Sequence, residues 1–285
     1  GTKAIIPNTV VTIGDWAFSD CKALTTVVLP ACVTNIGAYA FYNCSKLKNI
    51  NLPNGVMAIG SSAFYGCSSL EEIVIPEGVK EINYGTFDGC LKLKSVKIPD
   101  SVKYIGGHAF DEWCWQLYDE STIKGVRLVD GWCVGYNDEL SGAIDLTMTR
   151  GVSAGAFQDC INLEEVKLPV IESIGSYMFD GCSSLIKVYI PDGVRRLEAC
   201  SFGDCSSLLS ISIPSTVKLL EPNVFKGCSD SLFDKNTIPG IEMVDGWVIK
   251  GEKSLSGVLD ISNVRGIAGG AFVGCTELTD VVFPN

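Results

Sequence analysis

Short apolar runs separated by turn residues recur along the whole chain, about once every 23 residues. Within residues 67–87, apolar and exposable side chains alternate from Ile73 to Ile75, which is typical of a β-strand. Pro76 cannot donate to a sheet and ends this strand, and Gly78 marks a turn. A second short extended stretch then closes with Phe87. The pattern predicts coils with two extended sides and tight corners.

A phenylalanine is followed by a cysteine three or four residues later at ten places, which are Phe18/Cys21, Phe41/Cys44, Phe64/Cys67, Phe87/Cys90, Phe110/Cys114, Phe157/Cys160, Phe179/Cys182, Phe202/Cys205, Phe225/Cys228 and Phe272/Cys275. A period of 20 to 50 residues indicates a solenoid, in which each coil buries its apolar side against its neighbours. Stacked coils place matching positions side by side. We therefore expect a phenylalanine spine and a cysteine spine in the core.

Two linked motifs recur in eight or more coils. Cys-x-x-Leu-x-x-Ile-x-Leu-Pro stands at residues 44–53, and Val-x-x-Ile-Gly-x-x-Ala-Phe follows at residues 56–64. With these motifs the chain resembles the BspA-like (treponemal-type) leucine-rich repeat family over nearly its whole length. The resemblance implies a right-handed, curved leucine-rich-repeat solenoid of about 12 coils, with short parallel strands, turns and little helix. It also implies a bacterial cell-surface or secreted protein with a role in adhesion.

The period breaks twice, at residues 114–160 and 228–275, and we interpret each break as two degenerate coils. The breaks resemble each other, and matching cysteines lie about 115 residues apart. The sequence thus predicts one solenoid over residues 1–285 with two duplicated blocks, about 45–159 (the first block) and 160–274 (the second block). Both ends stop in mid-coil, so we expect a piece of a longer protein.

Asp-Gly between apolar alternations predicts a hairpin inside each break. The stretches 115–123 and 229–238 lack the repeat pattern and are expected to form loops, which in solenoids often lie on the binding face. Candidate loop residues are Trp115, Tyr118, Phe233 and Lys235. The alternative is that the loops, with Trp132 and Trp247, only cover a corner of the core.

Outward strand positions form a predicted binding face, consisting of Asn49, Asn51, Glu72, Val74, Ser95, Lys97, Glu165, Lys167, Lys187, Tyr189, Ser210 and Ser212. Charges alternate between coils at Lys48, Glu71 and Lys94, and such pairs stabilise a sheet modestly. The face is mixed in character and holds no large aromatic cluster.

The thirteen cysteines allow a disulfide framework, a metal site or buried thiols. Parallel side chains at the strand spacing lie farther apart than a disulfide prefers, and there is no Cys-x-x-Cys pair. Free cysteine packs as a small hydrophobe, so we favour buried thiols and expect no metal or cofactor. Cys32, Cys133 and Cys200 lie outside the spine and are expected to be the exposed thiols.

Catalysis finds little support. His108 is the only histidine, and it occupies a repeat slot that holds Trp16, Tyr39 and Ser62 in other coils. Adjacent carboxylates on a strand point to opposite faces and cannot act on one atom. A net charge of −11 argues against nucleic acid as a partner. The chain has no apolar run of 18 residues that would indicate membrane insertion.

The sequence therefore predicts a non-enzymatic interaction scaffold for a protein or glycan ligand, for example on a host surface, which is a monomer in isolation. The alternative is a structural spacer with no ligand of its own.

Overall fold

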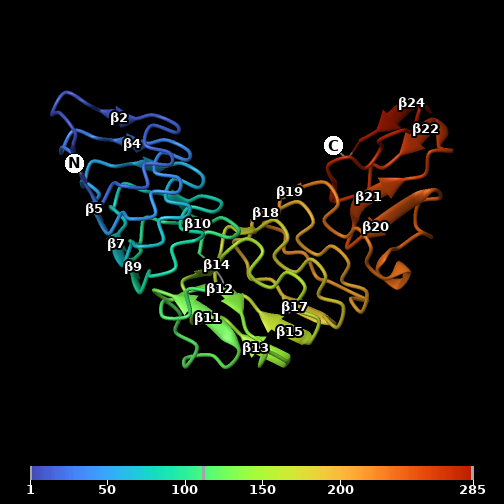
Figure 1. Ribbon diagram of the computed structural model, residues 1–285. Coiled ribbons are helices and arrows are strands. Elements are labelled where there is room, and N and C mark those ends of the chain that lie inside the picture. The colour runs from blue at the N-terminus through green and yellow to red at the C-terminus, as the bar shows by residue number, and fades with distance from the viewer. Residues whose placement is uncertain (1, 111–112, 284–285) are drawn as a thin grey trace. The chain divides into compact units, whose positions relative to one another are not determined.

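A computed structural model describes residues 2–110 and 113–283, so the ends of the predicted range 1–285 lie outside it. The chain forms a β-solenoid of about 12 turns with parallel strands and almost no helix, as the sequence predicts. It divides into two compact units: unit 1 comprises Gly1–Asn137 with Gly151–Ala154, and unit 2 comprises Asp138–Arg150 with Gly155–Asn285. Within each unit, successive coils lie one on the next (Figure 1).

One side of the unit 1 coils carries three-residue strands, whose outward side we call the strand face. These strands are β1 (Lys3–Ile5), β3 (Thr26–Val28), β5 (Asn49–Asn51), β7 (Glu72–Val74) and β9 (Ser95–Lys97). The other side carries β2 (Thr12–Ile13), β4 (Asn35–Ile36), β6 (Ala58–Ile59), β8 (Glu81–Ile82) and β10 (Tyr104–Ile105). Unit 1 is completed by β11 (Val126–Val129), β12 (Trp132–Tyr136) and β14 (Gly151–Val152).

Unit 2 repeats this arrangement. Its strand face contains β13 (Gly142–Asp145), β15 (Leu163–Lys167), β17 (Lys187–Tyr189), β22 (Ser256–Asp260) and β24 (Glu277–Val282). Its other strands are β16 (Ser173–Ile174), β18 (Arg196–Leu197), β19 (Leu219–Leu220), β20 (Ile241–Val244), β21 (Trp247–Gly251) and β23 (Gly266–Ile267), and a 3-10 turn, η1, covers Asp230–Leu232. In the three-residue strands β5, β7 and β17 the middle residue is buried and its neighbours face outward.

The phenylalanine spine is confirmed in each unit. Phe41 and Phe64 stack with ring centroids 5.4 Å apart and planes 5° apart, and Phe179 and Phe202 repeat the 5.4 Å spacing. These four rings are fully buried. Aromatic burial of this size is a main source of stability, and the common ring orientation keeps neighbouring coils in register.

The cysteine spine is also confirmed, and its thiols bond as well as pack. Six spine thiols donate from Sγ to the carbonyl of a phenylalanine in the preceding coil, as in Cys67 to Phe41 (3.2 Å) and Cys182 to Phe157 (3.1 Å), whereas Cys114 donates to the carbonyl of Cys90. Burial raises the pKa of Cys44 and of Cys160 to about 11. None of the thirteen cysteines, all of which the structure describes, forms a disulfide.

The expectation for the thiols outside the spine was wrong for Cys133. This residue lies in β12 and is fully buried, and burial raises its pKa to about 12. Cys32 and Cys200 are half-buried, and Cys21 in the spine is exposed because it lies on the first spine coil. The hairpin explains the error, because the side to which β12 turns Cys133 depends on its register with β11.

The Asp-Gly hairpins form as predicted in both breaks. β11 and β12 pair antiparallel around Asp130 and Gly131, and β20 and β21 do so around Asp245 and Gly246. All four turn residues have positive φ, which a tight two-residue hairpin requires. β12 then pairs in parallel with β14, and β21 with β23, so each hairpin is built into the stack.

Trp132 and Trp247 pack in the core beside these hairpins, each only 4% exposed. Their rings lie against Gly151 and Gly266, where an added Cβ would come within 2.3 Å and 2.4 Å of ring atoms. This placement fits the interpretation that the two tryptophans cover the core.

Candidate functional site

The twelve residues of the predicted binding face all lie on the outward side, and ten of them are exposed while Ser95 and Glu165 are half-buried. Most neighbouring strands of the face are hydrogen-bonded to each other, as β15 is to β17, where Glu165 lies opposite Lys187. The predicted charge alternation includes a direct ion pair between Glu71 Oε2 and Lys94 Nζ at 2.7 Å.

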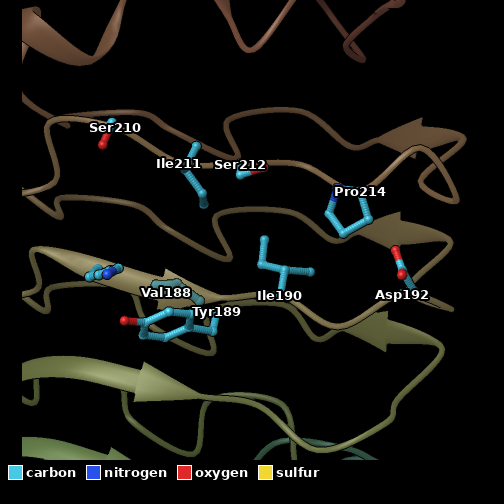
Figure 2. A pocket seen from close by; sticks show the side chains of 9 residues that line it. Val188, Tyr189, Ile190, Asp192, Ser210, Ile211, Ser212 and Pro214 are labelled. Carbon is cyan, nitrogen blue, oxygen red and sulfur yellow. The ribbon is translucent and has the colours of Figure 1, made fainter.

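One part of the face is hollowed. An open groove of about 450 Å³ separates β17 from the next coil, and we call it the β17 groove. Figure 2 shows its two walls, one formed by β17 and the residues after it and the other by residues 210–214. Four residues of the predicted binding face line it, namely Lys187, Tyr189, Ser210 and Ser212. Its volume falls within the range of ligand pockets in proteins.

The groove exists because the strand ladder stops at β17. Within the described residues, β17 pairs with β15 only, and residues 209–213 are not in a strand. At the matching step of the first block, β7 and β9 pair in register, and Ile75 N–H donates to the carbonyl of Lys97 at 2.9 Å. In unit 1 the neighbouring strands β5 and β7 are likewise not paired with each other, but both coils keep strand conformation there.

Main-chain polar groups face this groove from both walls. The Tyr189 carbonyl accepts a hydrogen bond from Leu168 N–H on the β15 side at 3.2 Å. Because the main-chain polar groups of successive strand residues point to opposite edges, those of Val188 and Ile190 point toward the groove. On the far wall Ile213 N–H donates to Asp245 Oδ2 at 2.8 Å, away from the groove, and alternation turns Ser212 toward it. Among the described residues no main-chain bond joins the two walls.

The far wall is held in place from behind. The Arg265 guanidinium donates to the carbonyls of Ile213 (2.8 Å) and Pro214 (3.2 Å), and it also pairs with Asp245 Oδ2 at 2.6 Å. A second hollow of about 300 Å³ lies beside this anchor and is lined partly by Trp247 and Arg265. The β20–β21 hairpin thus fixes one side of the β17 groove.

Charge is distributed unequally along the groove. Lys187 Nζ lies 4.4 Å from the centroid of the Tyr189 ring and Lys167 Nζ lies 5.9 Å from it, which are cation–π distances. A hydrogen bond to the Tyr189 side chain raises the pKa of Lys187, so this lysine stays charged at neutral pH. Asp192 stands at the other end of the groove and is exposed.

The predicted loop residues do not join this site. Trp115 is 74% exposed, whereas Tyr118 is half-buried with the Arg127 guanidinium 5.4 Å from its ring centroid. Phe233 is half-buried, and Lys235 forms ion pairs with Asp230 (3.1 Å) and Glu242 (3.4 Å). Both loops fold back onto their hairpins through the bridges Asp119–Leu128 and Asp234–Met243.

Two features go beyond what the sequence predicts, although it does predict a small aromatic patch of Trp16 and Tyr39 from adjacent coils. Trp16, Tyr39, Tyr42 and Tyr65 form an aromatic cluster on unit 1, with Trp16 and Tyr39 stacked at 4.1 Å and Tyr42 and Tyr65 at 4.9 Å. The spacing of Tyr42 and Tyr65 by one period was the available signal. The second feature is the exposed pair Ile186 and Leu209 beside the β17 groove, which stands where the first block has Glu71 and Lys94.

His108 behaves as a variable repeat slot. It has positive φ like Trp16, Tyr39 and Ser62 at the same corner, and its ring lies against Tyr84 with centroids 5.7 Å apart. Within residues 2–110 and 113–283, no three His, Cys, Asp or Glu side chains are grouped to hold a metal. The same residues hold no helix with the length and apolar character that a bilayer crossing requires.

A comparison with known protein families matches the first part of the chain. Residues 2–117 match the family described as BspA type leucine rich repeat region, in six copies. No curated protein sequence matches the chain.

Solved bacterial structures are similar to the chain. A leucine-rich repeat protein from Bacteroides ovatus shares 28% identity over 97% of this chain and 71% of its own, with a TM-score of 0.40. The T. pallidum leucine rich repeat protein shares 26% identity over 73% of this chain and 78% of its own, with a TM-score of 0.39. A leucine rich cell surface protein from Faecalibacterium prausnitzii shares 24% identity over 100% of this chain and 88% of its own, with a TM-score of 0.39. Residues 2–117, with their repeated coils and six family copies, belong to the BspA-type leucine-rich repeat family.

Proposed function

We propose that the chain is a non-enzymatic interaction scaffold that binds a protein or glycan ligand through the strand face of unit 2. The observation that carries the proposal is the β17 groove, which brings four residues of the predicted binding face together around unpaired main-chain groups. Repeat proteins of this family are typically non-enzymatic, and a solenoid offers an extended surface for binding.

The proposal includes a place for the protein on a bacterial cell surface or in the secreted fraction. The BspA-type match over residues 2–117 supports this location. The net charge of −11 disfavours nucleic acid as the ligand, because phosphate neutralisation needs clustered lysine and arginine.

A binding screen tests the proposal. The whole chain is applied to arrays of matrix proteins, peptides and glycans, together with the variants Tyr189→Ala and Lys167→Ala. We expect a specific ligand whose binding falls at least fivefold in both variants, since each removes part of the cation–π cluster beside the groove.

The matched control is Val74→Ala, because Val74 occupies the position of Tyr189 in the first block, on a pair of strands that are zipped together. Binding that falls equally in the control would contradict a site at the β17 groove. Silence on every array would favour the structural spacer.

A further inference from the structure

The ladder interrupted at β17 gives the binding site a more specific chemistry. We infer that the β17 groove takes an extended peptide segment, which completes the missing strand pairing between β17 and residues 210–212. This inference rests on the proposed function and names the class of its ligand.

The main chain supplies the first argument. The N–H and C=O of Val188, the N–H of Ile190 and the polar groups of Ser212 face the groove without a partner among the described residues. An added strand would satisfy these groups on both of its edges, which is how a peptide binds to an open sheet edge. A sugar presents hydroxyl groups without the regular alternation of donor and acceptor that this ladder requires.

Space and shape supply the second argument. The groove of about 450 Å³ runs from Lys187 to Asp192 on one wall and from Ser210 to Pro214 on the other. Five extended residues span about 17 Å, which suits walls of five or six residues each. The Ile211 and Ile190 side chains lie between the walls in Figure 2, so the floor of the groove is apolar.

The side chains around the groove select the peptide. Lys187 puts a positive charge at the β17 end of the groove and Asp192 puts a negative charge at the far end, whereas Lys167 on the neighbouring strand β15 is paired with Asp145 Oδ2 at 3.5 Å. Ile186 and Leu209 are 49% and 59% exposed next to the lysine end. The complementary ligand carries an acidic residue at one end, a basic residue about four positions away and apolar residues between them.

The Tyr189 ring argues against a glycan as the main occupant. Sugars bind aromatic residues by stacking on an open ring face. Here Lys187 Nζ lies 4.4 Å from the ring centroid and Lys167 Nζ lies 5.9 Å from it, so the lysines compete for that ring. The acidic side chain of a peptide would instead pair with Lys187, which lines the groove.

The test uses the whole chain and an array of six-residue peptides with an acidic residue, two or three β-branched residues and a basic residue, in both chain directions. Scrambled-charge peptides serve as controls. We expect binding by one direction, slower amide exchange at Val188, Ile190 and Ser212 on binding, and no change at Ile73, Ile75 and Lys97 in the first block.

Two substitutions separate main-chain pairing from side-chain contact. Ser212→Pro removes an N–H that faces the groove and is expected to weaken binding about fivefold to tenfold, the loss of about one hydrogen bond. Ser212→Ala keeps that N–H and is expected to bind as the native chain does. N-methylation of the peptide tests the same pairing without changing the protein, and it should weaken binding at each residue between the walls, because successive N–H groups point to opposite walls.

The outcomes distinguish the two proposals. Glycan binding with no peptide binding would overturn the inference and leave the interaction scaffold standing. Peptide binding that tolerates N-methylation at every position, or that gives no protection at Val188 and Ser212, would overturn it as well. Binding of neither class would overturn both.

Discussion

Two pairs of neighbouring coils stand at matching positions, 115 residues apart: β7 with β9 in the first block, and β17 with residues 210–212 in the second. Only the first pair is joined by strand hydrogen bonds. Their interiors are alike, with Ile73 and Val96 in one place and Val188 and Ile211 in the other. Their outer residues differ: the Glu71–Lys94 ion pair of the first block is replaced by Ile186 and Leu209. The difference teaches that the inward residues determine the coil, whereas pairing between neighbouring coils is decided locally.

The largest expected effect is on the free energy of unfolding, and it should be equal for the cores of the two units. Phe64→Ala and Phe179→Ala each remove a fully buried ring that is stacked on both sides in its own unit. We expect each substitution to lower the free energy of unfolding by about 3–5 kcal/mol, the usual cost of such a truncation. Urea unfolding of both variants measures this cost. A difference of more than about 2 kcal/mol between them would contradict equal cores.

The two hairpins offer the second comparison, because β12 has Cys133 where β21 has Val248, and both side chains are fully buried. Burial raises the pKa of Cys133 to about 12 from the usual cysteine value of about 9, so the unfolded state loses this proton first as the pH rises. Stability from this thiol is complete below pH 9 and falls by about 1.4 kcal/mol per pH unit above it, until about pH 12.

Cys133→Val should remove that part of the alkaline loss, which amounts to about 3 kcal/mol between pH 9 and pH 11. At pH 7 the variant should differ from the native chain by less than about 1.5 kcal/mol, because the change nearly conserves volume. Urea midpoints at pH 7, 9, 10 and 11 measure both effects. Equal alkaline slopes for the two proteins would show that the thiol is not protected by the fold.

Proline substitutions at matching positions test whether the two blocks differ in strand pairing. Lys97→Pro removes a main-chain donor from β9, which is paired with β7, whereas Ser212→Pro removes a donor that has no partner among the described residues. We expect Lys97→Pro to cost about 2 kcal/mol more than Ser212→Pro, since it leaves a carbonyl of β7 unpaired. Thermal or urea unfolding of the two variants decides this. Equal costs would mean that residues 210–212 are held to β17 in solution.

The sequence predicted the parts of the fold that repeat. The period alone indicated the coils, the stacked rings such as Phe41 and Phe64, and the thiol spine, because these depend on inward positions that recur. The Asp-Gly pairs indicated both hairpins, because a two-residue turn requires positive φ at these positions. The burial of Cys133 could not be predicted, since the register of β12 against β11 shifts within the hairpin.

The candidate site was predicted only in part. Lys187, Tyr189, Ser210 and Ser212 were identified as outward residues, and they line the β17 groove. The groove itself was not predicted, because it lies where two neighbouring coils do not pair, and those coils resemble paired coils in sequence. The only signal was the exchange of a charged pair for Ile186 and Leu209 between the blocks, and its effect on pairing depends on small energies.

The smallest effect concerns that exchange. Ile186→Glu combined with Leu209→Lys transfers the Glu71–Lys94 pair to the second block. Exposed ion pairs are weak and are screened by salt, so we expect amide exchange at Val188, Ile190 and Ser212 to slow only about twofold to fivefold, and only at low ionic strength. The matched control replaces both residues with glutamine, which removes the apolar surface without adding charge. Equal exchange rates in the two variants at low salt would show that the charges contribute nothing to pairing between these two coils.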